Sequence, residues 1–64
     1  MNITEARKVV RICYEIILNR TPNESEIDHW SKTIVNKKWD DVDVIYEFVS
    51  SKEFANMRGK DGKK

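Results

Sequence analysis

Apolar residues recur every three or four positions along the first third of the chain. The series on one helical face is Ile3, Ala6, Val10, Cys13 and Ile17, and it is widened by Val9, Ile12 and Ile16. This pattern predicts an amphipathic helix that begins near residue 3, capped by Asn2 or Thr4, and ends near Arg20. A strand is disfavoured because the pairs Val9-Val10 and Ile16-Ile17 interrupt the alternation that a half-buried strand needs. The apolar arc is wide, so we expect neighbours on more than one side of this helix.

A proline then separates the first helix from a second one. Pro22 disfavours helical backbone at the residue before it, which stops the first helix. Asn23 is a good N-cap, and Glu26 stands three positions later, the spacing of a capping box. A second helix is therefore predicted from about residue 24 to residue 36, with Ile27, Trp30 and Ile34 on its inner face. The link is short, which favours an antiparallel helical hairpin.

The last third of the chain predicts two shorter helices. Asp40 or Asp41 is expected to cap a third helix whose inner face holds Val42, Ile45, Phe48 and Val49. Val44 and Tyr46 fall outside that face and are expected to be half exposed. Ser50 and Glu53 have the spacing of a capping box, so a bend is predicted at Ser50. A short last helix should follow, holding Phe54 and Met57 and ending at Gly59.

These elements predict an all-α fold: a small bundle of three main helices plus a short C-terminal helix. We expect one domain over residues 1–58 and a flexible basic tail over residues 59–64. With 64 residues, such a domain buries only about 60% of its unfolded surface, so its stability is expected to be marginal without a partner. The tail resembles a linker, so the chain is interpreted as a possible fragment of a longer protein.

Composition excludes several classes of function. The chain has 12 basic and 11 acidic residues, a net charge of +1, which argues against a general nucleic-acid binder. Cys13 is the only cysteine, so no internal disulfide is possible, and with His29 it gives no metal-ligand set. No apolar run approaches the roughly 20 residues of a membrane span. We expect a soluble chain with no cofactor; its compartment is unknown, with the cytoplasm favoured.

Several short motifs in the sequence resemble those of the family called domain of unknown function 4214. They are Leu18-Asn19-Arg20-Thr21-Pro22, then Trp30 in the next helix, then Phe48-Val49-Ser50-Ser51-Lys52-Glu53-Phe54. Asn19 stands where that family often has glycine, which is acceptable because asparagine also reaches left-handed backbone conformations. Glu26 stands where a glycine is frequent. The resemblance implies a small helical accessory module of larger bacterial proteins, some of them surface-associated or attached to glycosyltransferase-like domains, with no assigned activity.

Three polar or aromatic residues are candidates for contact with a partner or ligand: Arg20, Trp39 and Tyr46. Arg20 lies at the C-terminal end of the first helix. We expect its guanidinium to bond the last carbonyls of that helix or a nearby carboxylate, tying the turn to the second or third helix, with Asp43 or Glu47 as the named candidates. If it does not, an anion or partner contact is the alternative. Trp39 precedes the third helix and is a candidate aromatic anchor for a partner.

Other chemistry-bearing residues have simpler structural interpretations. His29 is expected on the polar surface, Trp30 in the core and Cys13 as a small buried side chain. The acidic cluster at residues 40–43 lacks the loop layout of a calcium site, so helix capping is the expected role. Pro22, Asn23, Glu26, Ser50 and Glu53 are interpreted as turn and cap residues.

The sequence predicts no catalytic residue, and the leading hypothesis is a non-enzymatic helical protein-interaction or scaffolding module. Its partner would be another protein, a neighbouring domain or further copies of the chain in a small homo-oligomer. The alternative is an accessory domain that binds carbohydrate or a cell-surface polymer, suggested by the family context and by Trp39, Tyr46 and Arg20. A DNA-binding helix-turn-helix is disfavoured by the near-neutral charge and the proline in the turn.

Overall fold

The described part of the computed structural model, residues 1–56, consists of helices joined by short connections. The main helices are α1 (Ile3–Ile16), α2 (Glu24–Lys37) and α3 (Asp41–Val49), and a short helix follows over residues 52–56. No strand occurs in this range. The all-α prediction is therefore confirmed, whereas the predicted position of Met57 and the predicted tail lie outside the described residues.

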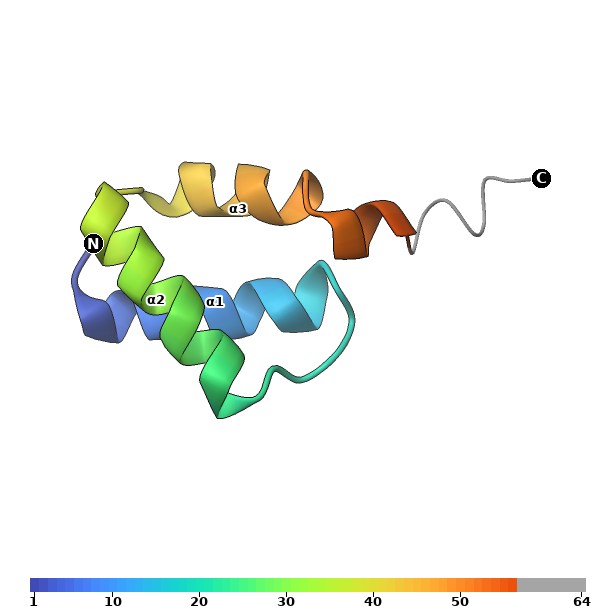
Figure 1. Ribbon diagram of the computed structural model, residues 1–64, viewed down its shortest axis with the longest axis horizontal. Helices are drawn as coiled ribbons and strands as arrows, with labels where there is room; N and C mark the ends of the chain where they lie inside the picture. Colours follow the sequence, from blue (N-terminus) through green and yellow to red (C-terminus); the bar gives the residue numbers. More distant parts are fainter. Residues whose placement is uncertain (57–64) are drawn as a thin grey trace.

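The chain reverses direction at each connection between main helices (Figure 1). α2 lies across α1 and runs back along it, and α3 then runs in the direction of α1. α1 packs chiefly against α2 and also against α3. The predicted antiparallel hairpin of the first two helices is thus present, and α1 is contacted from two sides as its wide apolar arc indicated.

Each main helix begins at a residue whose side chain accepts a hydrogen bond from the first turn. Asn2 Oδ1 accepts from the N–H of Glu5 at 2.8 Å, and Asn23 Oδ1 accepts from the N–H of Glu26, also at 2.8 Å. The Glu26 carboxylate accepts in return from the N–H of Asn23 at 3.0 Å, which completes the predicted capping box. Asp40 caps α3 through the N–H of Asp43 at 3.0 Å. Each such cap stabilises its helix by about 1 kcal/mol.

The first helix ends four residues earlier than predicted, at Ile16 instead of Arg20. The prediction relied on the proline, but the chain leaves the helix sooner because Asn19 adopts a left-handed conformation with φ 56°. Amide N–H groups of Leu18 and Arg20 both donate to the carbonyl oxygen of Tyr14 at 3.2 Å. This tight turn returns Leu18 to the core and brings Arg20 beside Tyr14.

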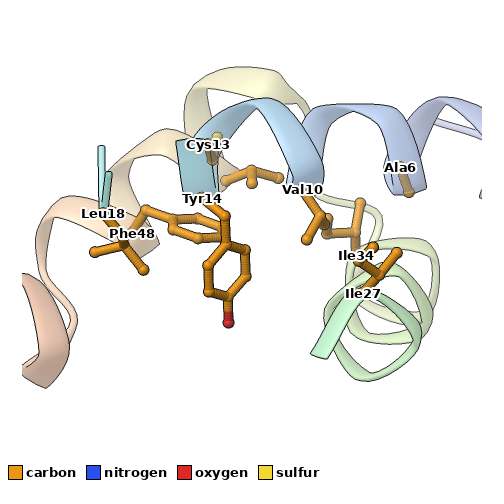
Figure 2. Packing of buried hydrophobic residues seen from close by; sticks show 9 residues of the cluster. Ala6, Val10, Cys13, Tyr14, Leu18, Ile27, Ile34 and Phe48 are labelled. Atoms are coloured by element: carbon orange, nitrogen blue, oxygen red, sulfur yellow. The ribbon is translucent and has the colours of Figure 1, made fainter. Parts of the chain in front are cut away.

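Side chains from all three main helices and from the first turn form one hydrophobic core (Figure 2). Its buried members are Ala6, Val10, Cys13, Tyr14, Leu18, Ile27, Ile34, Val44 and Phe48. Cys13 is buried as predicted. Ser31 is the buried polar residue of this core, and its hydroxyl donates to the carbonyl oxygen of Asp28 at 3.1 Å.

The predicted inner face of α3 is wrong for three of its four residues. Phe48 is fully buried, but its companion is Val44, which is 0% exposed, whereas Val42 is 68% exposed. Ile45 and Val49 also point outward. Two apolar stripes share this helix, and the spacing alone does not say which one faces the core. Phe48 decides, because its ring packs against two aromatic rings from α1 and α2 and so fixes the rotation of α3.

The start of the last helix also differs from the prediction. Ser50 is the C-cap of α3. Ser51 caps the short last helix, and its hydroxyl accepts a hydrogen bond from the N–H of Phe54 at 3.2 Å. The same hydroxyl donates to the carbonyl oxygen of Phe48 at 2.7 Å. The predicted box of Ser50 and Glu53 does not form, since the Glu53 carboxylate is engaged elsewhere.

Candidate functional site

Arg20 forms the most extensive polar cluster in the described residues, by joining two carboxylates. Its Nε donates to Glu53 Oε2 at 2.6 Å and its Nη2 to Glu53 Oε1 at 3.0 Å. On the other side, Nη1 donates to Glu26 Oε1 at 3.0 Å and Nη2 to Glu26 Oε2 at 2.7 Å. Two bidentate pairs of this kind are the strongest geometry that an arginine and a carboxylate adopt.

The expected link from Arg20 to a carboxylate of the second helix is present, but the named acids of the third helix are not its partners. The bonded acids are Glu26 in the first turn of α2 and Glu53 in the last short helix, not Asp43 or Glu47. Asp43 is engaged in capping α3 instead. The cluster therefore joins the turn after α1 to the start of α2 and to the C-terminal short helix.

An aromatic group lies directly under this ionic cluster. The Arg20 guanidinium carbon stands 4.7 Å from the centre of the Tyr14 ring, a cation–π contact. The Trp30 indole N–H donates to the Tyr14 hydroxyl at 3.0 Å. Phe48 packs edge-on against Tyr14 with ring centres 5.1 Å apart, and it stacks on Trp30 at 4.2 Å. Trp30 is thus only half-buried and packs against the core, whereas the sequence predicted that it lies within the core.

The ion pairs of the cluster shift the pKa values of Arg20, Glu26 and Glu53 in the directions that favour their charged forms. Hydrogen bonds from Arg20 lower the pKa of Glu53 and, together with the N–H of Asn23, lower the pKa of Glu26. The same pairing raises the pKa of the guanidinium, and burial raises the pKa of the Tyr14 phenol. Four of the five guanidinium N–H groups are already donated within the chain. The arrangement is therefore suited to holding three segments together, and it leaves little capacity for an external anion.

The three predicted contact residues are not brought together. Arg20 precedes α2 and Trp39 follows it, so the length of a 14-residue helix, about 20 Å, separates the connections that carry them. Trp39 is half-buried against the core, and its backbone N–H donates to the carbonyl oxygen of Ile34 at 3.0 Å. Tyr46 is 66% exposed on the outer side of α3, consistent with its expected exposure.

Tyr46 belongs to a surface that the sequence reasoning missed. Four apolar residues of α3 are all exposed, and we call them the α3 stripe: Val42, Ile45, Tyr46 and Val49. Their positions are i, i+3, i+4 and i+7, the spacing by which a helix presents one apolar face to a partner. Val42, Ile45 and Val49 were predicted on the inner face of the helix and, of these four, only Tyr46 outside it, so the series was not recognised as one exposed face.

The α3 stripe continues onto α1 through a shallow apolar groove. The groove has a volume of about 250 Å³ and is lined by Ile12, Cys13, Ile16, Ile17 and Ile45. Ile12 and Ile16 are themselves exposed. Ile45 of the α3 stripe therefore adjoins Ile12 and Ile16 in the groove. The two helices that carry them run in the same direction (Figure 1).

The other side chains that could bind a metal ion or an anion do not form a site within the described residues. Residues 1–56 contain no group of three or more His, Cys, Asp or Glu side chains placed to hold a metal ion. His29 is exposed, as predicted. Arg7 pairs with Glu24 on the surface, while Lys8 and Arg11 lie beside it on α1. No helix in the described range has both the length and the apolar character to cross a membrane.

Comparison with known proteins identifies the family but no characterised relative. No curated protein and no solved structure matches the chain significantly. A family model with the description Domain of unknown function (DUF4214) matches residues 2–58. That match spans nearly the whole chain, from the cap of α1 to the short last helix, and includes the Arg20 cluster and the α3 stripe. The chain therefore belongs to the DUF4214 family, in agreement with the resemblance of its turn and closing phrases.

Proposed function

We propose that this chain is a non-enzymatic protein-interaction module whose binding surface is the α3 stripe with Ile12 and Ile16. The observation that carries the proposal is the exposure of a complete i, i+3, i+4, i+7 apolar series on a helix whose other side is already buried. A contiguous apolar surface of this kind is a marker of a binding site. Scattered single apolar residues would not support the same conclusion.

The rest of the structure supports this role by holding the surface rigid. Phe48 and Val44 anchor α3 to the core on the side opposite the stripe. The Arg20 cluster fastens the short helix that follows α3 to the start of α2. A partner would therefore meet a surface that needs little ordering, which reduces the entropic cost of binding. Burying half of a valine or isoleucine side chain contributes about 1 kcal/mol.

The alternative function, binding of carbohydrate or a cell-surface polymer, has weaker support. It was suggested by Arg20, Trp39 and Tyr46, but the first is bonded to two carboxylates and the second packs against the core. Only Tyr46 offers an exposed ring. Titration with oligosaccharides while tryptophan fluorescence is followed would revive this alternative if saturable binding appeared.

Site-specific photo-cross-linking tests the interaction proposal. A benzophenone-bearing phenylalanine is introduced at position 46, within the α3 stripe, in the cells that naturally produce the chain. The matched control carries the same group at position 32, where the Lys32 side chain is 72% exposed on α2. We expect a discrete protein adduct from position 46 and none from position 32. Equal or absent labelling from the two positions would contradict the proposal.

A further inference from the structure

We infer that the partner of the α3 stripe is a second copy of this chain, docked antiparallel across a two-fold axis. The inference rests on the proposed function, because it names the occupant of the same surface. Three observations favour it over an unrelated partner: the spacing of the stripe, the charges at its two ends and the size of the apolar surface.

The spacing of the stripe is the same in both directions. Val42, Ile45, Tyr46 and Val49 are separated by three, one and three positions, so reversing the helix reproduces the series. In an antiparallel pair, Val42 of one copy lies opposite Val49 of the other, and Ile45 of one copy lies opposite Tyr46 of the other, close to the axis. A two-fold interface requires this kind of self-complementarity, because the same patch serves both copies.

The charges select the antiparallel arrangement over the parallel one. α3 begins with the exposed acids Asp40 and Asp41, and the exposed Lys52 begins the short helix beyond its C-terminal end. That short helix continues in nearly the same direction as α3 (Figure 1). Antiparallel docking brings Lys52 of one copy to the acidic end of the other and also opposes the helix dipoles favourably. Parallel docking would place the aspartates of one copy beside the same aspartates of the other, where like charges repel.

The apolar surface is large enough for a modest dimer. The six residues are 42–75% exposed. At on the order of 80–100 Å² for each side chain, they leave roughly 500 Å² of apolar surface in water for each copy. Full burial of this area in two copies would remove about 1,000 Å² of apolar surface from water, plus the charged rim, which is the lower limit for a biological interface. The flank formed by Ile12 and Ile16 is included in this area, because it adjoins Ile45 in the groove.

Sedimentation measurements with a matched pair of variants test the dimer. Val49 and Val35 are 42% and 40% exposed, and both lie in the last turn of their helices. The wild-type chain should be dimeric at micromolar to millimolar concentration. Val49→Asp should raise the dimer dissociation constant more than about tenfold, because it places a charge in both halves of the interface. Val35→Asp should leave the constant within about threefold. Circular dichroism confirms that both variants remain helical.

Disulfide trapping tests the orientation of the two copies. Chains carrying Val42→Cys are mixed with chains carrying Val49→Cys, and the wild type serves as control for the buried Cys13. The mixed disulfide should form faster than either like-with-like disulfide. Dominance of the Val42→Cys pair with itself would overturn the antiparallel arrangement.

The outcomes separate this inference from the function on which it rests. A chain that stays monomeric at millimolar concentration, yet gives an adduct with a different protein from position 46, would overturn the second-copy inference. It would leave the interaction function standing. A monomer that gives no adduct at all would overturn both.

Discussion

Arg20 and Glu53 form a bidentate ion pair although 33 positions separate them in the sequence. The pair fixes the short C-terminal helix to the turn after α1, and Glu26 completes the link to α2. Surface ion pairs contribute little when they are isolated, but a guanidinium that holds two carboxylates and lies over an aromatic ring is fixed by several contacts at once. This cluster therefore holds the turn after α1, the start of α2 and the short C-terminal helix together by polar contacts, in addition to the hydrophobic core.

Replacing Arg20 by lysine should lower the melting temperature, because an ammonium group cannot make the two bidentate contacts. The control is Arg7→Lys, since Arg7 makes a single contact with the exposed Glu24. Thermal unfolding followed by circular dichroism should show a drop of several degrees for Arg20→Lys and little change for Arg7→Lys. Equal melting temperatures for the two variants would show that the cluster does not contribute to stability.

The cluster should also make stability depend on pH in the acid range. Pairing with Arg20 lowers the pKa of Glu53 and of Glu26 in the folded chain, whereas an unfolded glutamate titrates near about 4.3. The unfolded chain therefore binds protons first as the pH falls. The stabilisation is fully present above about pH 5 and is lost as the pH falls through the lowered pKa values.

The comparison that isolates this effect is wild type against Glu53→Gln. The difference in unfolding free energy, measured with urea between pH 7 and pH 2.5, should be largest near neutral pH and should shrink toward zero in acid. Glu15→Gln is the control, because Glu15 is exposed and has no ion-pair partner among the described residues. A wild-type advantage over Glu53→Gln that does not change with pH would contradict the electrostatic interpretation.

Local signals predicted the three main helices and included the N-cap of each, Asn23 alone and Asn2 and Asp40 each as one of two candidates. Asn23 and Glu26 stand at the right spacing next to Pro22, and a cap depends only on residues within one turn. The left-handed conformation at Asn19 also agrees with its position in the family phrase. These features are fixed by neighbouring residues, so a single sequence is sufficient to find them.

The misassigned features depend on contacts between distant segments. The sequence shows that Val42 and Val44 are both apolar, but only the packing of Phe48 between rings of other helices decides which one is buried. The partner of Arg20 was likewise misassigned, because Glu53 becomes its neighbour only through the turn of the chain after α3. Surplus apolar positions on α3 were the available sign that one stripe had to face outward.

The rotation of α3 can be tested with the same substitution at two positions. Val44→Ala removes a fully buried side chain and should cost about 1–3 kcal/mol of unfolding free energy, including the cavity that it leaves. Val42→Ala, on the exposed side of the same helix, should cost less than about 0.5 kcal/mol in the monomeric chain. Urea unfolding at low concentration measures both. A larger cost at Val42 than at Val44 would contradict the observed orientation.

Tyr14→Phe tests the hydrogen bond beneath the ionic cluster. The change keeps the ring, its edge-on contact with Phe48 and its contact with Arg20, but removes the acceptor of the Trp30 indole N–H. A half-buried donor without a partner should reduce stability by about 1–2 kcal/mol. Tyr46→Phe, which removes the same hydroxyl from an exposed ring, is the control and should have almost no effect. Denaturant unfolding followed by tryptophan fluorescence gives both values.

A substitution in the turn after α1 is expected to keep or raise the unfolding free energy. Asn19 holds φ at 56°, a conformation that glycine adopts without the strain of a Cβ atom. Asn19→Gly should therefore match the wild type or exceed it by up to about 1 kcal/mol, whereas Asn19→Ala should lose about 1 kcal/mol. Asn36, exposed on α2 with helical backbone, provides the control, because glycine there should destabilise the helix by a few tenths of a kcal/mol, roughly 0.3, relative to asparagine. The urea midpoint should thus stay the same or rise for Asn19→Gly and fall for Asn36→Gly, and a clear fall for Asn19→Gly would contradict the role of the left-handed residue in ending α1.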